Sequence, residues 1–194
     1  MSAQTGTVEL VGEETVENVA RAALLAALTG AFAYVSFPNP LSPAPISLQV
    51  LGVFLAGILL GPAWGGVSMV LYLLAGAVGA PVFAGGSAGF GVLWLQPTSG
   101  YLWSYPLAAF AIGALVHGGL AVRDPSERSL VRLVGAMVVG TAVIYAFGVV
   151  GMSLVLGLTL EKAFVAGAVA FLPAEAFKIA AAVGVVRSDQ LAAE

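Results

Sequence analysis

The 194-residue chain has few charged residues, one histidine and no cysteine. Asp, Glu, Lys and Arg make up 9% of it, whereas an ordinary soluble domain contains about 25%. The absence of cysteine excludes disulfides and thiolate metal sites, and a lone His117 excludes a metal centre built from several histidines. We therefore expect neither a metal site nor a bound cofactor.

The charges that do occur are distributed very unevenly. No Asp, Glu, Lys or Arg occurs from position 22 to 122 or from position 133 to 160. A helix needs about 20 mostly apolar residues to cross the hydrocarbon core of a bilayer, so these stretches predict several crossings. The predicted fold class is an all-α integral membrane protein with six transmembrane helices. We expect it in the cell membrane as a multi-pass protein that contacts lipid and no nucleic acid.

Prolines and glycines divide the apolar sequence into segments. The predicted helices cover 20–37, 46–60, 67–78, 101–122, 133–156 and 163–186. The prolines of PNPLSPAP end the first helix, and GPAWGG predicts a tight turn between the second and third. The resulting division is an acidic N-terminal tail (1–19), a six-helix transmembrane domain (20–187) and a C-terminal tail (188–194).

The arginines predict the orientation in the membrane. With six crossings, one side carries Arg21, Arg123, Arg128, Arg132 and Arg187, whereas the other carries only Lys162. Because Lys and Arg concentrate on the cytoplasmic side of membrane proteins, both termini are expected in the cytoplasm. The proline-rich loop and the glycine-rich loop VFAGGSAGFGV would then face outward.

Two charged residues interrupt the last predicted helix, in the sequence FLPAEAFKIAAA. Glu175 and Lys178 are spaced i, i+3 and share a face, and each costs about 2.5–3.5 kcal/mol at the centre of a bilayer. Pro173 removes the donor for the carbonyl of Val169, which predicts a kink. One interpretation is a self-satisfied ion pair that lies between packed helices. The other is a cavity in which Lys178 binds a ligand carboxylate and Glu175 accepts from ligand N–H groups.

The order of several motifs along the chain resembles the BioY family, the biotin-binding S components of energy-coupling factor (ECF) vitamin transporters. These motifs are ARAALLAALTG, PISLQVLGVFLAGILLGPAWG, YLLAGAVGAPVFAGG, QPTSGYL and PAEAFK. The resemblance implies a six-helix substrate-binding domain that captures biotin from outside with high affinity. It also implies that the chain is not an enzyme.

The resemblance further implies a set of site residues. Lys178 would meet the valerate carboxylate of biotin, and Glu175 would accept from the ureido nitrogens. Further candidates are Gln49, Tyr72, Phe83, Gly85, Gly86, Thr98 and Tyr101. The family usually has Asp where this chain has Glu175, so the carboxylate is one methylene farther from the backbone.

The first predicted helix carries a set of alanines four residues apart, Ala22, Ala23, Ala26 and Ala27. Such a smooth face permits close helix packing. It could serve packing within the chain, or, as the resemblance implies, docking to an EcfT-like transmembrane scaffold. The chain has no G-x-x-x-x-G-K-[ST] phosphate loop, so ATP would act only on partner ABC-type ATPase subunits.

Three other functions stay open from the residues alone. The chain could be an S component for another small vitamin, a membrane-embedded enzyme that uses Glu175 as acid or base, or a structural membrane subunit. The enzyme interpretation has no nucleophilic cysteine or metal cluster to support it, and His117 is expected to be an interfacial or packing residue.

Overall fold

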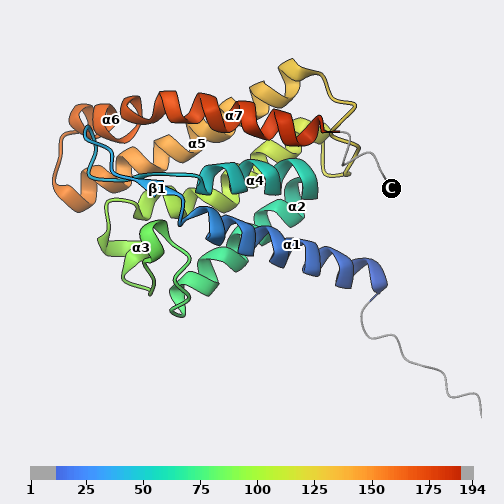
Figure 1. Ribbon diagram of the computed structural model, residues 1–194, viewed down its shortest axis with the longest axis horizontal. Helices are drawn as coiled ribbons and strands as arrows, with labels where there is room; N and C mark the ends of the chain where they lie inside the picture. Colours follow the sequence, from blue (N-terminus) through green and yellow to red (C-terminus); the bar gives the residue numbers. More distant parts are fainter. Residues whose placement is uncertain (1–11, 189–194) are drawn as a thin grey trace, which may run out of the picture.

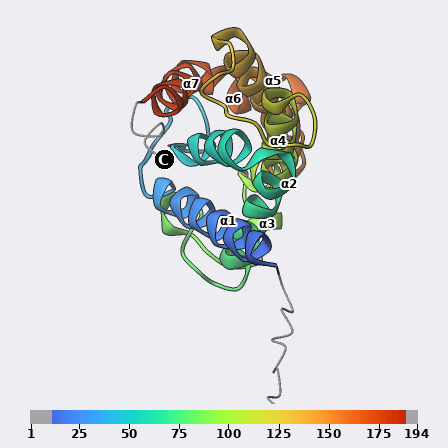
Figure 2. The ribbon, with the colours of Figure 1, turned by 90° about the vertical axis from the view of Figure 1, so that its right-hand side faces the viewer.

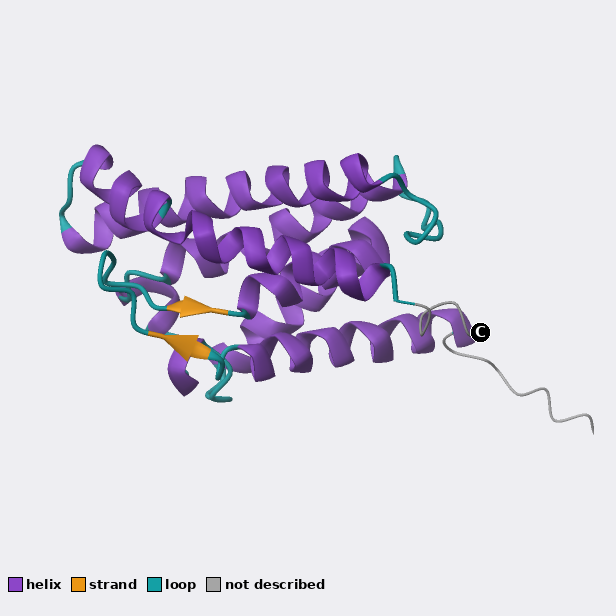
Figure 3. Cartoon of the chain, turned by 45° about the horizontal axis from the view of Figure 1, so that its top comes forward, coloured by secondary structure: helices purple, strands orange, loops and turns teal. Residues whose placement is uncertain are grey.

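The computed structural model describes residues 12–188, which form an elongated helical bundle (Figure 1). Its long elements are α1 (Glu13–Phe32), α2 (Gln49–Ala77), α4 (Ser99–His117), α5 (Leu130–Leu156), α6 (Leu160–Gly167) and α7 (Leu172–Val186). The short elements are β1 (Ser36–Phe37), β2 (Ile46–Ser47), η1 (Ala84–Gly86), α3 (Val92–Leu95) and η2 (Val169–Phe171). Strands β1 and β2 pair antiparallel and appear in orange in Figure 3.

Helix α2 reverses direction at Gly61, which adopts φ 76° and ψ −175°, a conformation available essentially to glycine alone. The two arms then pack against each other. A Cβ atom on Gly65 would lie 2.8 Å from the carbonyl oxygen of Ala56, and Gln49 Nε2 donates to the hydroxyl of Tyr72. The prediction of two short helices joined by a turn is confirmed, but the turn lies at Gly61 alone, and residues 62–66 already belong to the second arm. Both arms are visible in Figure 2.

His117 fills the hydrogen-bonding gap that this turn creates. Pro62 has no N–H, so the carbonyl of Ile58 loses its helical partner. The Nδ1 atom of His117 accepts from the backbone N–H of Arg123 at 3.1 Å, which leaves Nε2 to donate to the oxygen of Ile58 at 3.0 Å. The side chain is fully buried. His117 is therefore a packing residue of this turn. This is one of the two roles that the sequence predicted for it, and the interfacial role is not observed.

Several predicted helix boundaries are wrong. The first helix ends at Phe32, five residues before the predicted end, so the prolines of PNPLSPAP do not terminate it. The fourth helix ends at His117 and does not reach residue 122, because Gly118 adopts a left-handed conformation that caps it. The first begins at Glu13, seven residues before the predicted start, so part of the expected N-terminal tail is helical. The rest of that tail, residues 1–11, and the C-terminal tail beyond Ser188 lie outside the described residues.

The last predicted helix is broken rather than kinked. Helix α6 ends at Gly167, η2 follows, and α7 begins at Leu172 with Pro173 in its first turn. Proline is favoured at that position because the first N–H groups of a helix have no intrahelical partner. The break places Glu175 in the first turn of α7, where the positive end of the helix dipole favours a carboxylate.

The helices of the bundle include segments with the length and composition of membrane spans. Four stretches are long and apolar enough to cross one: Gln49–Ala77, Ser99–His117, Leu130–Leu156 and Leu160–Val186. Together with α1, and with α2 counted as two arms, residues 12–188 contain six helical units. The described ends of α1 and α7 lie at one end of the bundle, opposite β1 and α3 (Figure 1).

Helix α1 divides its alanines between two faces. Ala22 and Ala26 are buried, and the carbonyl of Ala22 accepts from the hydroxyl of Ser68 on α2. Ala23 and Ala27 are exposed. The prediction that all four form a docking face is therefore wrong for Ala22 and Ala26, which pack within the chain, and only Ala23 and Ala27 remain available to a partner.

The turn of α2 should depend on glycine at position 61. Gly61→Ala would force alanine into a strained conformation and bring its Cβ atom within 2.5 Å of Val122. We expect a loss of about 1–3 kcal/mol in unfolding free energy, measured by thermal unfolding in detergent. Gly184→Ala on α7, where a new Cβ atom has no neighbour within 4 Å, should leave stability unchanged or slightly raised. Equal effects of the two changes would contradict this role for Gly61.

Candidate functional site

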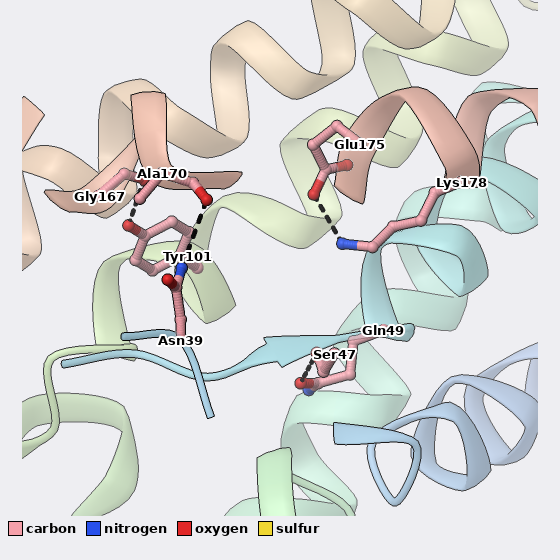
Figure 4. Close-up of polar contacts among 8 residues, drawn as sticks. All are labelled: Asn39, Ser47, Gln49, Tyr101, Gly167, Ala170, Glu175 and Lys178. Atoms are coloured by element: carbon pink, nitrogen blue, oxygen red, sulfur yellow. Dashed lines mark hydrogen bonds and ion pairs between the residues drawn. The ribbon is translucent and has the colours of Figure 1, made fainter. Parts of the chain in front are cut away.

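The centre of the candidate site is a buried ion pair on α7. Lys178 Nζ donates to Glu175 Oε1 at 2.6 Å, and their side chains are only 3% and 5% exposed. Figure 4 shows the pair facing Ser47 and Gln49, which lie at the end of β2 and the start of α2. Burial of two charges is costly even when they are paired, and a pair within one helix does not link α7 to its neighbours.

A cavity of about 50 Å³ lies beside the pair. Side chains of α2, α4, α5 and α7 line it, together with the segment 44–47 and Ala84. This volume holds a few water molecules, whereas pockets for small organic ligands measure about 300–1,000 Å³. The pair is therefore locked to itself but does not lie in solid packing, and a vitamin-sized ligand would require the cavity to expand.

Five of the nine predicted site residues line this cavity: Glu175, Lys178, Gln49, Thr98 and Tyr101. Gln49 is fixed in place because its Oε1 accepts from the hydroxyl of Ser47 at 2.7 Å while its Nε2 donates to Tyr72. Residues that are distant in sequence thus converge on one hollow, as a binding site requires.

The other four predicted residues lie outside the lining. Tyr72 is buried behind Gln49 and donates to the carbonyl of Val82 at 2.9 Å. Phe83 packs edge-on against Tyr72, with ring centroids 5.6 Å apart. Gly85 and Gly86 form a left-handed turn next to the cavity, which Ala84 lines in their place. Tyr72 and Phe83 therefore support the site from behind.

Several lining residues were not predicted. Tyr105 on α4, Tyr145 on α5 and Phe171 on η2 add aromatic walls. Their sequence signal is weak, since an aromatic residue in a transmembrane helix is as often lipid-facing or core as ligand-facing. Ala44 and Pro45 of the proline-rich loop were also missed as lining residues.

The outer end of the cavity is closed by the loop 38–45 between β1 and β2. On its far side lies an open hollow of about 470 Å³, and both hollows share Ala44 and Pro45 as lining residues. Asn39 holds the loop to the bundle because its Nδ2 donates to the carbonyl of Ala170 at 3.4 Å. This short loop is thus the partition between the inner cavity and the outer hollow.

The break between α6 and α7 is held by partners from elsewhere in the chain. The hydroxyl of Tyr101 donates to the carbonyl of Gly167, and Asn39 donates to that of Ala170 (Figure 4). These contacts satisfy carbonyls at the interruption of the helix, where an unpaired group would be costly within a membrane. Tyr101 therefore has a structural role as well as a place in the cavity wall.

Comparison with known proteins identifies the family of this chain. Residues 3–193 match the model of the BioY family. The chain belongs to the BioY family. Among curated relatives, the "Biotin transporter BioY" of Rhizobium etli is 38% identical over 142 residues, which cover 70% of this chain and 72% of the relative. The "Probable biotin transporter BioY" of Pyrococcus horikoshii is 36% identical over 167 residues, 86% of this chain and 92% of the relative.

A solved structure supports the fold assigned to this BioY chain. The crystal structure of an S-component for biotin from an ECF-type ABC transporter superposes with a TM-score of 0.80. It covers 92% of this chain and 93% of its own, at 24% sequence identity. The predicted all-α membrane architecture is confirmed. Because both BioY relatives are named as transporters, family membership sets the enzyme alternative aside.

The buried pair should be sensitive to the loss of one partner. Lys178→Met leaves the carboxylate of Glu175 buried without a cation, and we expect a loss of about 3–5 kcal/mol in stability. Combining it with Glu175→Gln removes both charges and should recover most of that loss in thermal unfolding. The exposed pair of Arg21 and Glu17 provides the control, since Arg21→Ala should cost under about 1 kcal/mol. If Lys178→Met and Arg21→Ala lowered the stability equally, burial could not be the cause of the loss.

Proposed function

We propose that this protein is the biotin-binding S component of an ECF-type uptake transporter and that it captures biotin from outside the cell. The observation that carries the proposal is the Glu175–Lys178 pair buried beside a cavity in a chain of the BioY family. Biotin carries a carboxylate and a urea, the two kinds of group that a lysine and a glutamate bind.

The pair retains hydrogen-bonding capacity for such a ligand. One N–H of Lys178 donates to Glu175 Oε1, which leaves two for a ligand oxygen, in our proposal the valerate carboxylate. Oε2 of Glu175 has no hydrogen-bond partner among the described residues and is available to a ureido N–H. Gln49, Thr98 and Tyr101 supply the wall, and the turn at Gly85 and Gly86 covers it.

Loading requires the loop 38–45 to move. A ligand that enters the outer hollow meets Ala44 and Pro45, and displacement of these residues would join the two hollows into a volume of ligand size. The 3.4 Å hydrogen bond from Asn39 to Ala170 and the burial of Ala44 in the core resist this motion.

The energy for uptake would come from partners, because the sequence lacks a phosphate loop. We propose that an EcfT-like transmembrane scaffold docks on the exposed face of α1 that carries Ala23 and Ala27, and that ABC-type ATPases drive it. The exposed Arg123, Arg132 and Arg187 support a cytoplasmic location for the end of the bundle at which α1 begins and α7 ends.

The role of Lys178 can be tested with biotin and its methyl ester. Lys178→Ala should raise the Kd for biotin at least tenfold, about 1.4 kcal/mol, in equilibrium binding to the purified chain. The ester has no carboxylate, so the same change should affect its weaker binding much less. Lys162→Ala, which removes an exposed lysine of α6, is the matched control and should alter neither Kd by more than about twofold.

Unchanged biotin affinity in Lys178→Ala would reject this role. An equal loss for biotin and its ester would mean that Lys178 binds another oxygen of the ligand, such as that of the urea.

The docking face can be tested separately from binding. Ala27→Leu should leave the Kd for biotin unchanged but reduce biotin uptake by cells that express the partner subunits, because the bulkier side chain holds the scaffold helix away. Ala180→Leu on the exposed face of α7 is the control and should not impair uptake. Ala26→Leu should instead lower stability, since Ala26 is buried. Normal uptake by Ala27→Leu would rule out docking on this face.

A further inference from the structure

Two buried polar atoms that line the cavity have no hydrogen-bond partner among residues 12–188. Among residues 12–188, four buried side-chain atoms lack a hydrogen bond: Arg128 Nε, Thr141 Oγ1, the hydroxyl of Tyr145 and Glu175 Oε2. Only Tyr145 and Glu175 belong to the lining of the inner cavity. Such groups are rare in folded proteins and call for an explanation.

Packing alone does not explain the hydroxyl of Tyr145. The ring also lines an apolar groove of about 510 Å³ on the outside of the bundle, between α5 and the α6–α7 segment. Its neighbours there include Ala146, Val149 and Leu172, which offer no hydrogen bond. A phenylalanine would fill this wall equally well, whereas the hydroxyl of Tyr145 adds a hydrogen-bond donor beside the carboxylate of Glu175.

The two unpaired atoms have complementary chemistry. A tyrosine hydroxyl can donate a proton, whereas a carboxylate oxygen only accepts. They come from facing helices, Tyr145 from α5 and Glu175 from α7, and they line the same small volume. A ligand group that presents an acceptor next to an N–H donor satisfies both atoms at once, and an amide or urea edge has this pattern.

We propose that Tyr145 is a specificity-determining residue whose hydroxyl donates to the carbonyl oxygen of a ligand urea while Glu175 Oε2 accepts from the adjacent N–H. This inference rests on the proposed function and deepens it, because it assigns the polar edge of biotin to two named atoms. The ring of Tyr145 lines both the cavity and the apolar groove. Tyr145 thus has two tasks: its ring closes the cavity wall, and its hydroxyl hydrogen-bonds to the ligand.

Tyr145→Phe separates these two tasks, since it keeps the ring and removes the hydroxyl. We expect the Kd for biotin to rise about three- to tenfold in equilibrium binding to the purified full chain, as for the loss of one hydrogen bond. The melting temperature without ligand should change little, because the hydroxyl makes no direct hydrogen bond among residues 12–188. Desthiobiotin, which keeps the urea and lacks the sulfur ring, should lose affinity by the same factor.

Thr141→Val is the matched control. It removes another unpaired hydroxyl from α5, one helical turn away, but Thr141 does not line the cavity. Its Kd for biotin should stay within about twofold of the wild-type value. Wild-type affinity in Tyr145→Phe would overturn the role of Tyr145 and leave the proposed function standing. A lower melting temperature with an equal loss of affinity in both variants would also overturn it, because the effect would then be structural. Failure of the wild-type chain to bind biotin would overturn both proposals.

Discussion

The site depends on a carboxylate and an ammonium group held 2.6 Å apart inside a bundle that is otherwise almost free of charge. The chain can keep them there for two physical reasons. The break before α7 puts Glu175 at the positive end of a helix, and Lys178 neutralises it one turn later. If only stability were required, two apolar residues would serve as well. The pair is therefore better explained by what its remaining hydrogen-bonding positions can do.

The same break connects the site to its cover. A helix that is interrupted within a membrane needs partners for its exposed carbonyls, and here they come from Tyr101 of α4 and Asn39 of the loop 38–45. Movement of that loop therefore changes the contacts of the segment that positions Glu175. Opening of the cavity and the geometry of the ion pair are in this way physically linked. The small volume seen beside the pair fits a closed arrangement of the loop.

The sequence predicted those features that depend on apolar length and on local backbone chemistry. The uncharged stretches gave the six helical units, and GPAWGG gave the reversal at Gly61. It did not predict the full break before α7, because that depends on Tyr101 and Asn39, which are distant in sequence from residues 167–171. The inward side of α1 was also beyond prediction, since alanines occur all around it and only packing against Ser68 selects Ala22. Tyr145 was missed because its importance lies in an unpaired hydroxyl, which is visible only in three dimensions.

Equilibrium binding of labelled biotin to the purified wild-type chain in detergent tests the central claim most directly. If the buried pair and its cavity are a vitamin site, the chain alone retains biotin with a nanomolar Kd, and excess unlabelled biotin displaces it. If a folded chain with a normal melting transition retains no biotin, the pair is a structural feature of the bundle and the proposed capture function is wrong.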